Sequence, residues 1–303
     1  MPDAIAPPAV APAQYKKFAL AAAALAVAFA VPLWKLFRFA VGEELQSYIP
    51  LMPLVCGYIV WTQKSQLPHG SAPARKPAAL FGIAGIAAAA GSVAMLHSAT
   101  PAQNSLALST LALLLCLASA GCWFLGGATM RFLAFPFALL IFMIPFPVPV
   151  RNLVEALLQH GSAAVAQWMF VLAGTPLLRE DMVFHLPGMT IRVAPECSGI
   201  HSTLVLFITS LMAGHMILRR PWKRAVLCLA VIPLALLRNG FRVFVIGELC
   251  VHVGPRMINS PIHRHGGPLF FVLSLAPFFL LLYFLRKSET TGAAGQPPNS
   301  ETN

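Results

Sequence analysis

The sequence has little charge for its length. Only 10% of the 303 residues are charged, whereas a soluble domain carries about a quarter. Hydrophobic residues make up 58% of the chain, and the mean hydropathy is +0.74. Several apolar runs approach or exceed the roughly 20 residues that span a bilayer. This composition excludes an ordinary soluble domain and predicts a membrane protein that crosses the bilayer several times.

Paired cysteines are also absent. The six cysteines form no Cys-x-x-Cys motif, and their spacing is not that of a disulfide framework or a zinc site. Five of them lie within apolar runs or at the end of one, where a free cysteine is typically a small packing residue. Cys197 is the exception, because it lies in the polar, glycine-containing stretch VAPECSGIHS (Val193 to Ser202).

The basic residues do not form the stripe that is typical of a nucleic-acid-binding protein. The formal net charge is +11, but lysine and arginine occur in short clusters between the apolar runs. Such clusters indicate membrane topology, because cytoplasmic loops carry an excess of basic residues. The densest cluster is RRPWKR (Arg219 to Arg224). With the N-terminus inside the cell, this cluster falls on the cytoplasmic side.

The sequence predicts an all-α polytopic membrane protein with about eight transmembrane helices. The apolar runs occupy residues 18–34, 46–63, 78–97, 104–126, 132–149, 199–218, 225–247 and 267–285. Segment 151–174 is interrupted by polar residues, so we expect an interfacial helix there. A full ninth span is the alternative, although it would place the basic 64–76 loop outside. We favour eight spans.

The two ends of the chain differ from the rest in composition. Residues 1–14 are rich in alanine and proline and are expected to be disordered, and the same holds for residues 287–303 on the cytoplasmic side. Lys16 and Lys17 precede an apolar run that is too long for a typical signal peptide, which favours a retained first helix. Residues 15–286 are therefore expected to form a single membrane-embedded domain.

A small extracytoplasmic β-hairpin is expected just before the cysteine motif. The stretch MVFHLPGMTIRVA (Met182 to Ala194) consists of two short alternating runs around a Pro-Gly pair. It leads directly to Cys197, and the span that follows returns the chain to the cytoplasmic side. Cys197 is thus expected on the outer side of the membrane.

Arginine and histidine are expected on that same side. Counted from Arg224 at 1.5 Å per residue, Arg238 lies roughly 21 Å up the next span and Arg242 roughly 27 Å up. In a hydrocarbon core about 30 Å thick, Arg242 is close to the outer boundary. His263 and His265 follow in the next outer loop. The topology therefore predicts that cysteine, arginine and histidine converge at the outer face.

Such a convergence is typical of a cysteine acyl-transfer site. A thiol attacks as the thiolate, and a nearby cation lowers the pKa of a thiol. Arginine suits this role because it stays charged, and it also stabilises an oxyanion. A histidine would protonate the leaving amine and later deprotonate the incoming nucleophile. Taken alone, each residue also has an ordinary explanation: core packing, snorkelling to headgroups, or a solvated loop.

Four motifs resemble the successive signatures of the exosortase/archaeosortase family of multi-span membrane transpeptidases. They are LAFPFALLIFMIPFP (Leu133–Pro147), VAPECSGIHS, LLRNGFRVFVI (Leu236–Ile246) and HRHGGPLFF (His263–Phe271), which occur in the family order. The resemblance covers about residues 45–285. It implies a cysteine transpeptidase in the bacterial cytoplasmic (inner) membrane, with its active site facing outward and without a metal or organic cofactor.

The resemblance also implies roles for particular residues. Cys197 takes the place of the nucleophile, Arg242 that of the arginine in Asn-x-x-Arg, which begins at Asn239, and His263 that of the histidine. Alternatives remain at two positions: Arg238 lies one helical turn before Arg242, and His265 competes with His263. Glu196 and His201 are possible supporting groups. Glu196 would need a cationic partner, because it lies beside the proposed thiolate, and His201 lies one turn into the next helix.

The substrate implied by the resemblance is a secreted protein with a short C-terminal motif of the PEP type, an apolar helix and a basic cytoplasmic end. We expect this helix to dock laterally against the spans, so that Cys197 attacks just outside the bilayer. An intramembrane protease would share that first step and end in hydrolysis. The alternative from another class is a non-catalytic component of a polysaccharide export or assembly system, in which Arg238 and Arg242 would line an anionic path.

Overall fold

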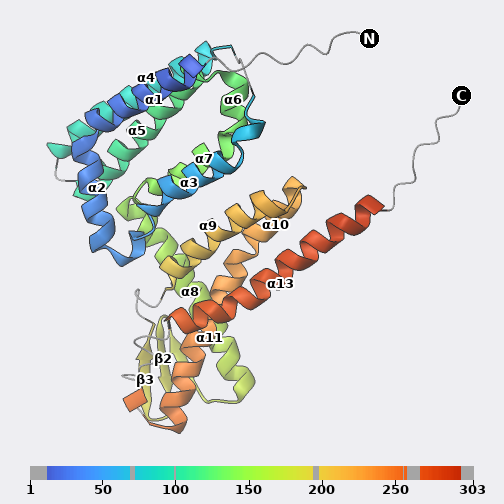
Figure 1. Ribbon diagram of the computed structural model, residues 1–303. Helices are drawn as coiled ribbons and strands as arrows, with labels where there is room; N and C mark the ends of the chain where they lie inside the picture. The colour runs from blue at the N-terminus through green and yellow to red at the C-terminus, as the bar shows by residue number, and fades with distance from the viewer. Residues whose placement is uncertain are drawn as a thin grey trace, which may run out of the picture. The chain divides into compact units, whose positions relative to one another are not determined.

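The protein is largely helical in the computed structural model (Figure 1). The structure describes residues 12–68, 72–98, 100–193, 198–254, 256–257 and 267–294. The chain divides into two compact units, Met1–Arg151 and Asn152–Asn303. The boundary between the two units falls inside the single domain predicted for residues 15–286. The single domain stays a prediction.

The first unit consists of helices only, among its described residues. They are α1 (Pro12–Ala28), α2 (Ala30–Gly42), η1 (Glu44–Gln46), α3 (Leu51–Thr62), η2 (Lys64–Gln66), α4 (Arg75–Leu96), α5 (Ala102–Phe124), α6 (Gly127–Phe132), α7 (Ala134–Leu139) and η3 (Leu140–Met143). Helices α4 and α5 lie side by side, and α1 lies along them (Figure 1). The predicted spans 78–97 and 104–126 are confirmed as α4 and α5.

Small side chains let α4 and α5 approach closely. A Cβ atom at Gly85 would lie 2.7 Å from Sγ of Cys116, so this position of α4 has room only for glycine. The hydroxyl of Ser119 donates to the carbonyl of Ala78 at 2.7 Å, across the same interface. Small residues and interhelical hydrogen bonds of this kind stabilise helix pairs in membranes, where hydrophobic burial between helices contributes little.

Three of the predicted spans are not single straight helices. The run 18–34 falls in α1 and α2, which are bent by 72° at Phe29; Pro32 has no N–H to donate to the carbonyl one turn earlier, which favours a bend there. Helix α3 is about 18 Å long, too short to cross the core alone, because it begins only after Pro50. The run 132–149 is divided among α6, α7, η3 and the start of α8.

The second unit combines helices with a small sheet. Its elements are α8 (Val148–Ala173, which begins in the first unit), β1 (Leu178–Glu180), β2 (Val183–Leu186), β3 (Met189–Arg192), α9 (Ile200–Ile217), α10 (Pro221–Leu229), α11 (Val231–His252) and α13 (Gly267–Ala294). Segment 151–174 is confirmed as helical within α8, and its depth in the membrane stays a prediction.

The sheet contains the predicted hairpin and one strand more. Strands β2 and β3 pair antiparallel with Leu186 opposite Met189, across the Pro187–Gly188 turn. Gly188 has φ of 81°, as the third position of a type II turn requires. Strand β1 adds to the other edge of β2. The expectation of two strands is therefore corrected to three: β1 has only three residues and shows no long alternating pattern.

The inner face of the sheet packs against helices α8 and α11. Phe170 of α8 and Phe184 of β2 are fully buried with their ring centroids 5.9 Å apart, and Val243 of α11 joins the same cluster. A Cβ atom at Gly247 of α11 would overlap the ring of Phe170. This close approach fixes α11 next to the sheet, whose last strand leads toward the cysteine motif.

The end of α13 holds the linker between α9 and α10 and the first turn of α10. Nζ of Lys223 is buried and donates to the carbonyl of Leu285 at 3.1 Å and to Oγ of Ser288 at 2.7 Å. The carboxylate of Glu289 accepts the backbone N–H groups of Arg219 and Arg220. Helix α1 begins at Pro12 and α13 ends at Ala294, so helix extends into both of the tails predicted to be disordered.

Replacing Lys223 by alanine is expected to destabilise the second unit. The variant removes the two hydrogen bonds that the buried ammonium group donates to the Leu285 carbonyl and the Ser288 hydroxyl, which costs about 2 kcal/mol. Thermal unfolding of the detergent-solubilised protein would measure the loss as a lower Tm. Arg219→Ala is the matched control, since it removes the same charge from an exposed side chain just before α10. Equal Tm values for the two variants would contradict the role of Lys223.

Five stretches among the described residues are long and apolar enough to cross a membrane: α4, α5, α9, α13 and the continuous stretch Pro221–His252 that contains α10 and α11. The number rises to seven if each of two bent pairs, α1 with α2 and Ala134–Met143 with α8, is one span. A mostly helical, multi-pass membrane protein with a small sheet is thus confirmed. The count is lower than eight because α3 is too short.

Candidate active site

The structure describes four of the eight predicted site residues. They are His201 in the first turn of α9, and Arg238, Asn239 and Arg242 on α11. The other four lie outside the described residues, and their roles stay predictions: Glu196, Cys197, His263 and His265. The described part of the site is therefore the start of α9, immediately after the cysteine, and the face of α11 that meets it.

The glycine of the Cys-Ser-Gly motif forms the turn into α9. Gly199 has a left-handed backbone with φ of 69° and caps the helix, which begins at Ile200. A Cβ atom at this position would lie 3.0 Å from Nη2 of Arg238 and 3.3 Å from Oδ1 of Asn239. Glycine is thus needed here both for the backbone conformation and for the close approach of α11.

Arg238 joins α11 to this turn. Its Nη2 donates to the carbonyl of Gly199 and to Oγ1 of Thr203, both at 3.3 Å. Thr203 in turn donates to the same carbonyl at 2.7 Å. The arginine side chain is 8% exposed and lies within a stretch that is apolar enough to span the membrane. A charge at such a position is costly and marks a functional site by default.

The two arginines of α11 differ in burial. Arg238 is buried, whereas Arg242, one turn further along the helix, is partly exposed. The sequence motifs indicate Arg238 only as an alternative to Arg242. The structure gives Arg238 a distinct task, which is to bind the turn that follows the cysteine, so the two need not compete for one role.

Sequence reasoning missed the residues that fix the neighbourhood of the site. Thr203 completes the contact between α9 and Arg238, and Gln159 of α8 donates to the carbonyl of Val193, the residue after β3. Thr203 lies four residues after Gly199, a spacing at which a threonine hydroxyl typically bonds back to the carbonyl of the preceding turn. Nothing in the sequence alone pairs Gln159 with Val193, because the two are distant along the chain.

A single carboxylate, that of Glu248, makes two contacts further along α11. Glu248 accepts a hydrogen bond from Oγ1 of Thr175, and its Oε2 is 3.0 Å from Nε2 of His252, one helical turn later. These contacts connect α11 to the segment between α8 and β1. They add a second attachment of α11 to the part of the chain that carries the sheet.

Replacing Gly199 by alanine is expected to remove most activity with a modest loss of stability. The left-handed backbone costs a residue with a side chain roughly 1–2 kcal/mol, and the methyl group would displace the guanidinium of Arg238. Gly188→Ala is the matched control, because Gly188 also has positive φ but an added methyl group would meet nothing within 4 Å. We expect similar Tm losses, with substrate processing falling at least about tenfold only for Gly199→Ala. Normal processing by Gly199→Ala would contradict the importance of this contact.

Comparison with protein families gives one match that covers most of the chain. The model of the transmembrane exosortase family matches residues 34–280, which include the turn at Gly199 and both arginines of α11. The chain belongs to the exosortase family. Comparison with curated proteins and with solved structures gives no significant match.

Membership of the exosortase family indicates which class of reaction the described site belongs to. Exosortases are membrane transpeptidases that process PEP-CTERM proteins, and membership implies that class of activity for this chain. The multi-pass membrane location agrees with the five to seven candidate spans. The predicted resemblance is thereby confirmed.

Proposed function

We propose that the protein is a cysteine transpeptidase of the bacterial cytoplasmic membrane, with its active site on the extracytoplasmic side. Its substrates are secreted proteins that end in a PEP-CTERM signal, which consists of a recognition motif, an apolar helix and a basic end. The enzyme cleaves this signal and transfers the protein to an acceptor. No metal or organic cofactor takes part in the proposed chemistry.

The reaction proceeds through a thioester. The Cys197 thiolate attacks the scissile carbonyl, and the C–N bond breaks as His263 donates a proton to the leaving amine. Arg242 stabilises the thiolate and the oxyanion of the tetrahedral intermediate. An acceptor amine, deprotonated by His263, then attacks the thioester, and the thiolate leaves. Water in place of the amine would give hydrolysis.

The contact of Arg238 and Asn239 with Gly199 is the observation that supports this proposal most. Cys197 precedes Gly199 by only two residues in the sequence. The proposal therefore places the nucleophile next to the Asn-x-x-Arg motif of α11. Asn239 and Arg238 orient the turn, while Glu196, His265 and His201 are supporting candidates.

Mass spectrometry of a co-expressed PEP-CTERM protein tests the proposal. We expect a new C-terminus at the recognition motif that carries an added amine-containing group. A free carboxylate at that position would indicate a protease rather than a transpeptidase. An intact substrate in the presence of the folded, inserted protein would contradict the proposal and favour a non-catalytic membrane component.

A further inference from the structure

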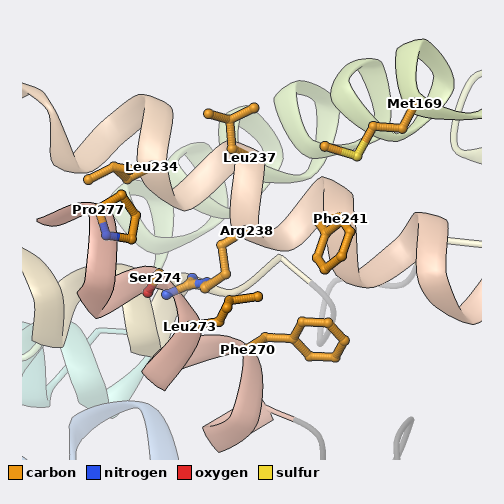
Figure 2. Close-up of a pocket in the computed structure, with 9 residues that line it drawn as sticks. All are labelled: Met169, Leu234, Leu237, Arg238, Phe241, Phe270, Leu273, Ser274 and Pro277. Atoms are coloured by element: carbon orange, nitrogen blue, oxygen red, sulfur yellow. The ribbon is translucent and has the colours of Figure 1, made fainter. Parts of the chain in front are cut away.

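A lateral cavity of about 370 Å³ lies between α11, α13 and one residue of α8 (Figure 2). Its lining follows one face of each of the two long helices, at positions i, i+3, i+4 and i+7. The lining residues are Met169 of α8, Leu234, Leu237, Arg238 and Phe241 of α11, and Phe270, Leu273, Ser274 and Pro277 of α13. We call this cavity the α11–α13 cleft. Each stripe runs from its first to its last residue over seven helical steps, which is about 10 Å or two turns.

The cleft is apolar except at one point. The guanidinium of Arg238 points toward Ser274, between the two stripes (Figure 2). The Ser274 hydroxyl already donates to the carbonyl of Phe271 at 2.6 Å. Nη2 of Arg238 is used by the turn at Gly199, but Nη1 is buried and meets no hydrogen-bond acceptor in the part of the chain that the structure describes. A buried cationic donor in this state is costly, so the cleft favours an occupant that brings an anionic acceptor.

We propose that the α11–α13 cleft binds the apolar segment of the substrate's C-terminal signal. An acidic side chain at the extracytoplasmic end of that segment would accept a hydrogen bond from Nη1 of Arg238. The inference rests on the proposed function and adds the place and chemistry of substrate recognition to it.

The shape and the charge of the cleft both favour this occupant. Apolar anchors spaced by three, four and seven residues on a binding helix fit a groove two turns long. Leu237 and Leu273 at the rim are 45% and 57% exposed, which leaves room for a membrane helix to enter from the side. Apolar lining alone would not select a helix over an acyl chain. The guanidinium favours a helix with an acidic side chain, because the count of residues along the span predicts that Arg238 lies roughly 21 Å from the cytoplasmic side. That depth is about two turns below the outer headgroups, where lipid phosphates do not lie.

The same side chain then links recognition to the site. One nitrogen of Arg238 contacts the carbonyl of Gly199, and the other would contact the substrate. A charge-assisted hydrogen bond of this kind is short and directional. Binding of the acidic side chain would therefore position the recognition motif relative to the turn that follows Cys197. Arg238 acts in this scheme as a positioning residue.

Site-specific photo-crosslinking tests the proposal. A photoreactive amino acid replaces Leu273 in the Cys197→Ala protein, which retains substrate because it cannot cleave it, and the probe is a co-expressed PEP-CTERM protein. Val272 is the matched control, since it lies on the same helix at the same height with 62% exposure and does not line the cleft. We expect substrate adducts at Leu273 at least tenfold above those at Val272. Replacing the acidic residues beside the substrate's apolar segment by glutamine should lower the adducts several-fold.

The possible failures are distinguishable. Equal adducts at the two positions, or adducts to lipid alone at Leu273, would overturn the cleft proposal, while processing by the wild-type protein would still uphold the proposed function. Substrate captured at Leu273 without any processing by the wild type would support the cleft and overturn the proposed function. As a second measurement, Leu273→Trp should fill the cleft and slow processing at least tenfold, whereas Val272→Trp, on another face of α13, should leave it unchanged. Normal processing by a folded Leu273→Trp protein would also overturn the cleft proposal.

Discussion

Replacing Cys197 by alanine is expected to abolish processing of a co-expressed PEP-CTERM protein while the variant still inserts into the membrane. The thiol is the group that forms the covalent bond in the proposed mechanism, and no other step supplies a nucleophile of comparable reactivity. Removing the nucleophile of a catalytic set costs up to about 10⁶ in kcat. Immunoblots of the substrate and of the membrane fraction would measure processing and insertion together.

Serine at the same position is expected to be nearly as inactive. A hydroxyl is far less ionised than a thiol at neutral pH, and an arginine does not remove its proton as a general base would. Cys250→Ala is the control, because Cys250 is a buried cysteine of α11 outside the proposed site. It tests whether the loss of a cysteine elsewhere in the protein also impairs processing. Persistent processing by Cys197→Ala would rule out the proposed nucleophile.

Replacing Arg242 by lysine is expected to lower processing by about 100-fold or more. Both side chains are cationic, so the variant keeps the charge and loses the planar fork of donors that holds a thiolate or an oxyanion. Initial rates with a purified substrate in detergent would measure the effect, which should appear in kcat. Arg192→Lys, on the exposed side of β3, is the control for a change of arginine to lysine near the site.

Arg238→Lys provides the comparison that separates the two arginines. Because Arg238 contacts the turn at Gly199 rather than the reacting atoms in this scheme, its replacement should raise KM more than it lowers kcat. Near-normal turnover by Arg242→Lys, together with an inactive Arg238→Lys protein, would exchange the roles assigned to the two residues.

The long apolar runs predicted much of the fold because the bilayer imposes a simple length requirement. Helices α4, α5, α9 and α13 coincide with predicted spans for that reason. The prediction was wrong where proline interrupts a run of suitable composition. Pro32 and Pro50 are visible in the sequence, but apolar composition alone counted the residues on both sides of them as one span.

The sequence predicted which residues belong to the candidate site better than it predicted the contacts between them. Arginine in a membrane span and glycine beside a cysteine are both unusual enough to be noticed. The hydrogen bond from Arg238 to Gly199 depends on how α9 and α11 pack, which no local pattern encodes. Likewise, the cleft arises where α11 packs beside α13, and the α13 stripe resembles an ordinary lipid-facing surface when it is considered alone.

The most direct test of the proposed mechanism is to isolate the acyl-enzyme. The wild-type protein would be mixed with a PEP-CTERM substrate, quenched in acid and digested, and the peptide that contains Cys197 would be analysed by mass spectrometry. We predict a substrate fragment attached to Cys197 through a bond that hydroxylamine cleaves, as expected of a thioester. An adduct on a different residue, or product formed with Cys197 never modified, would contradict the mechanism.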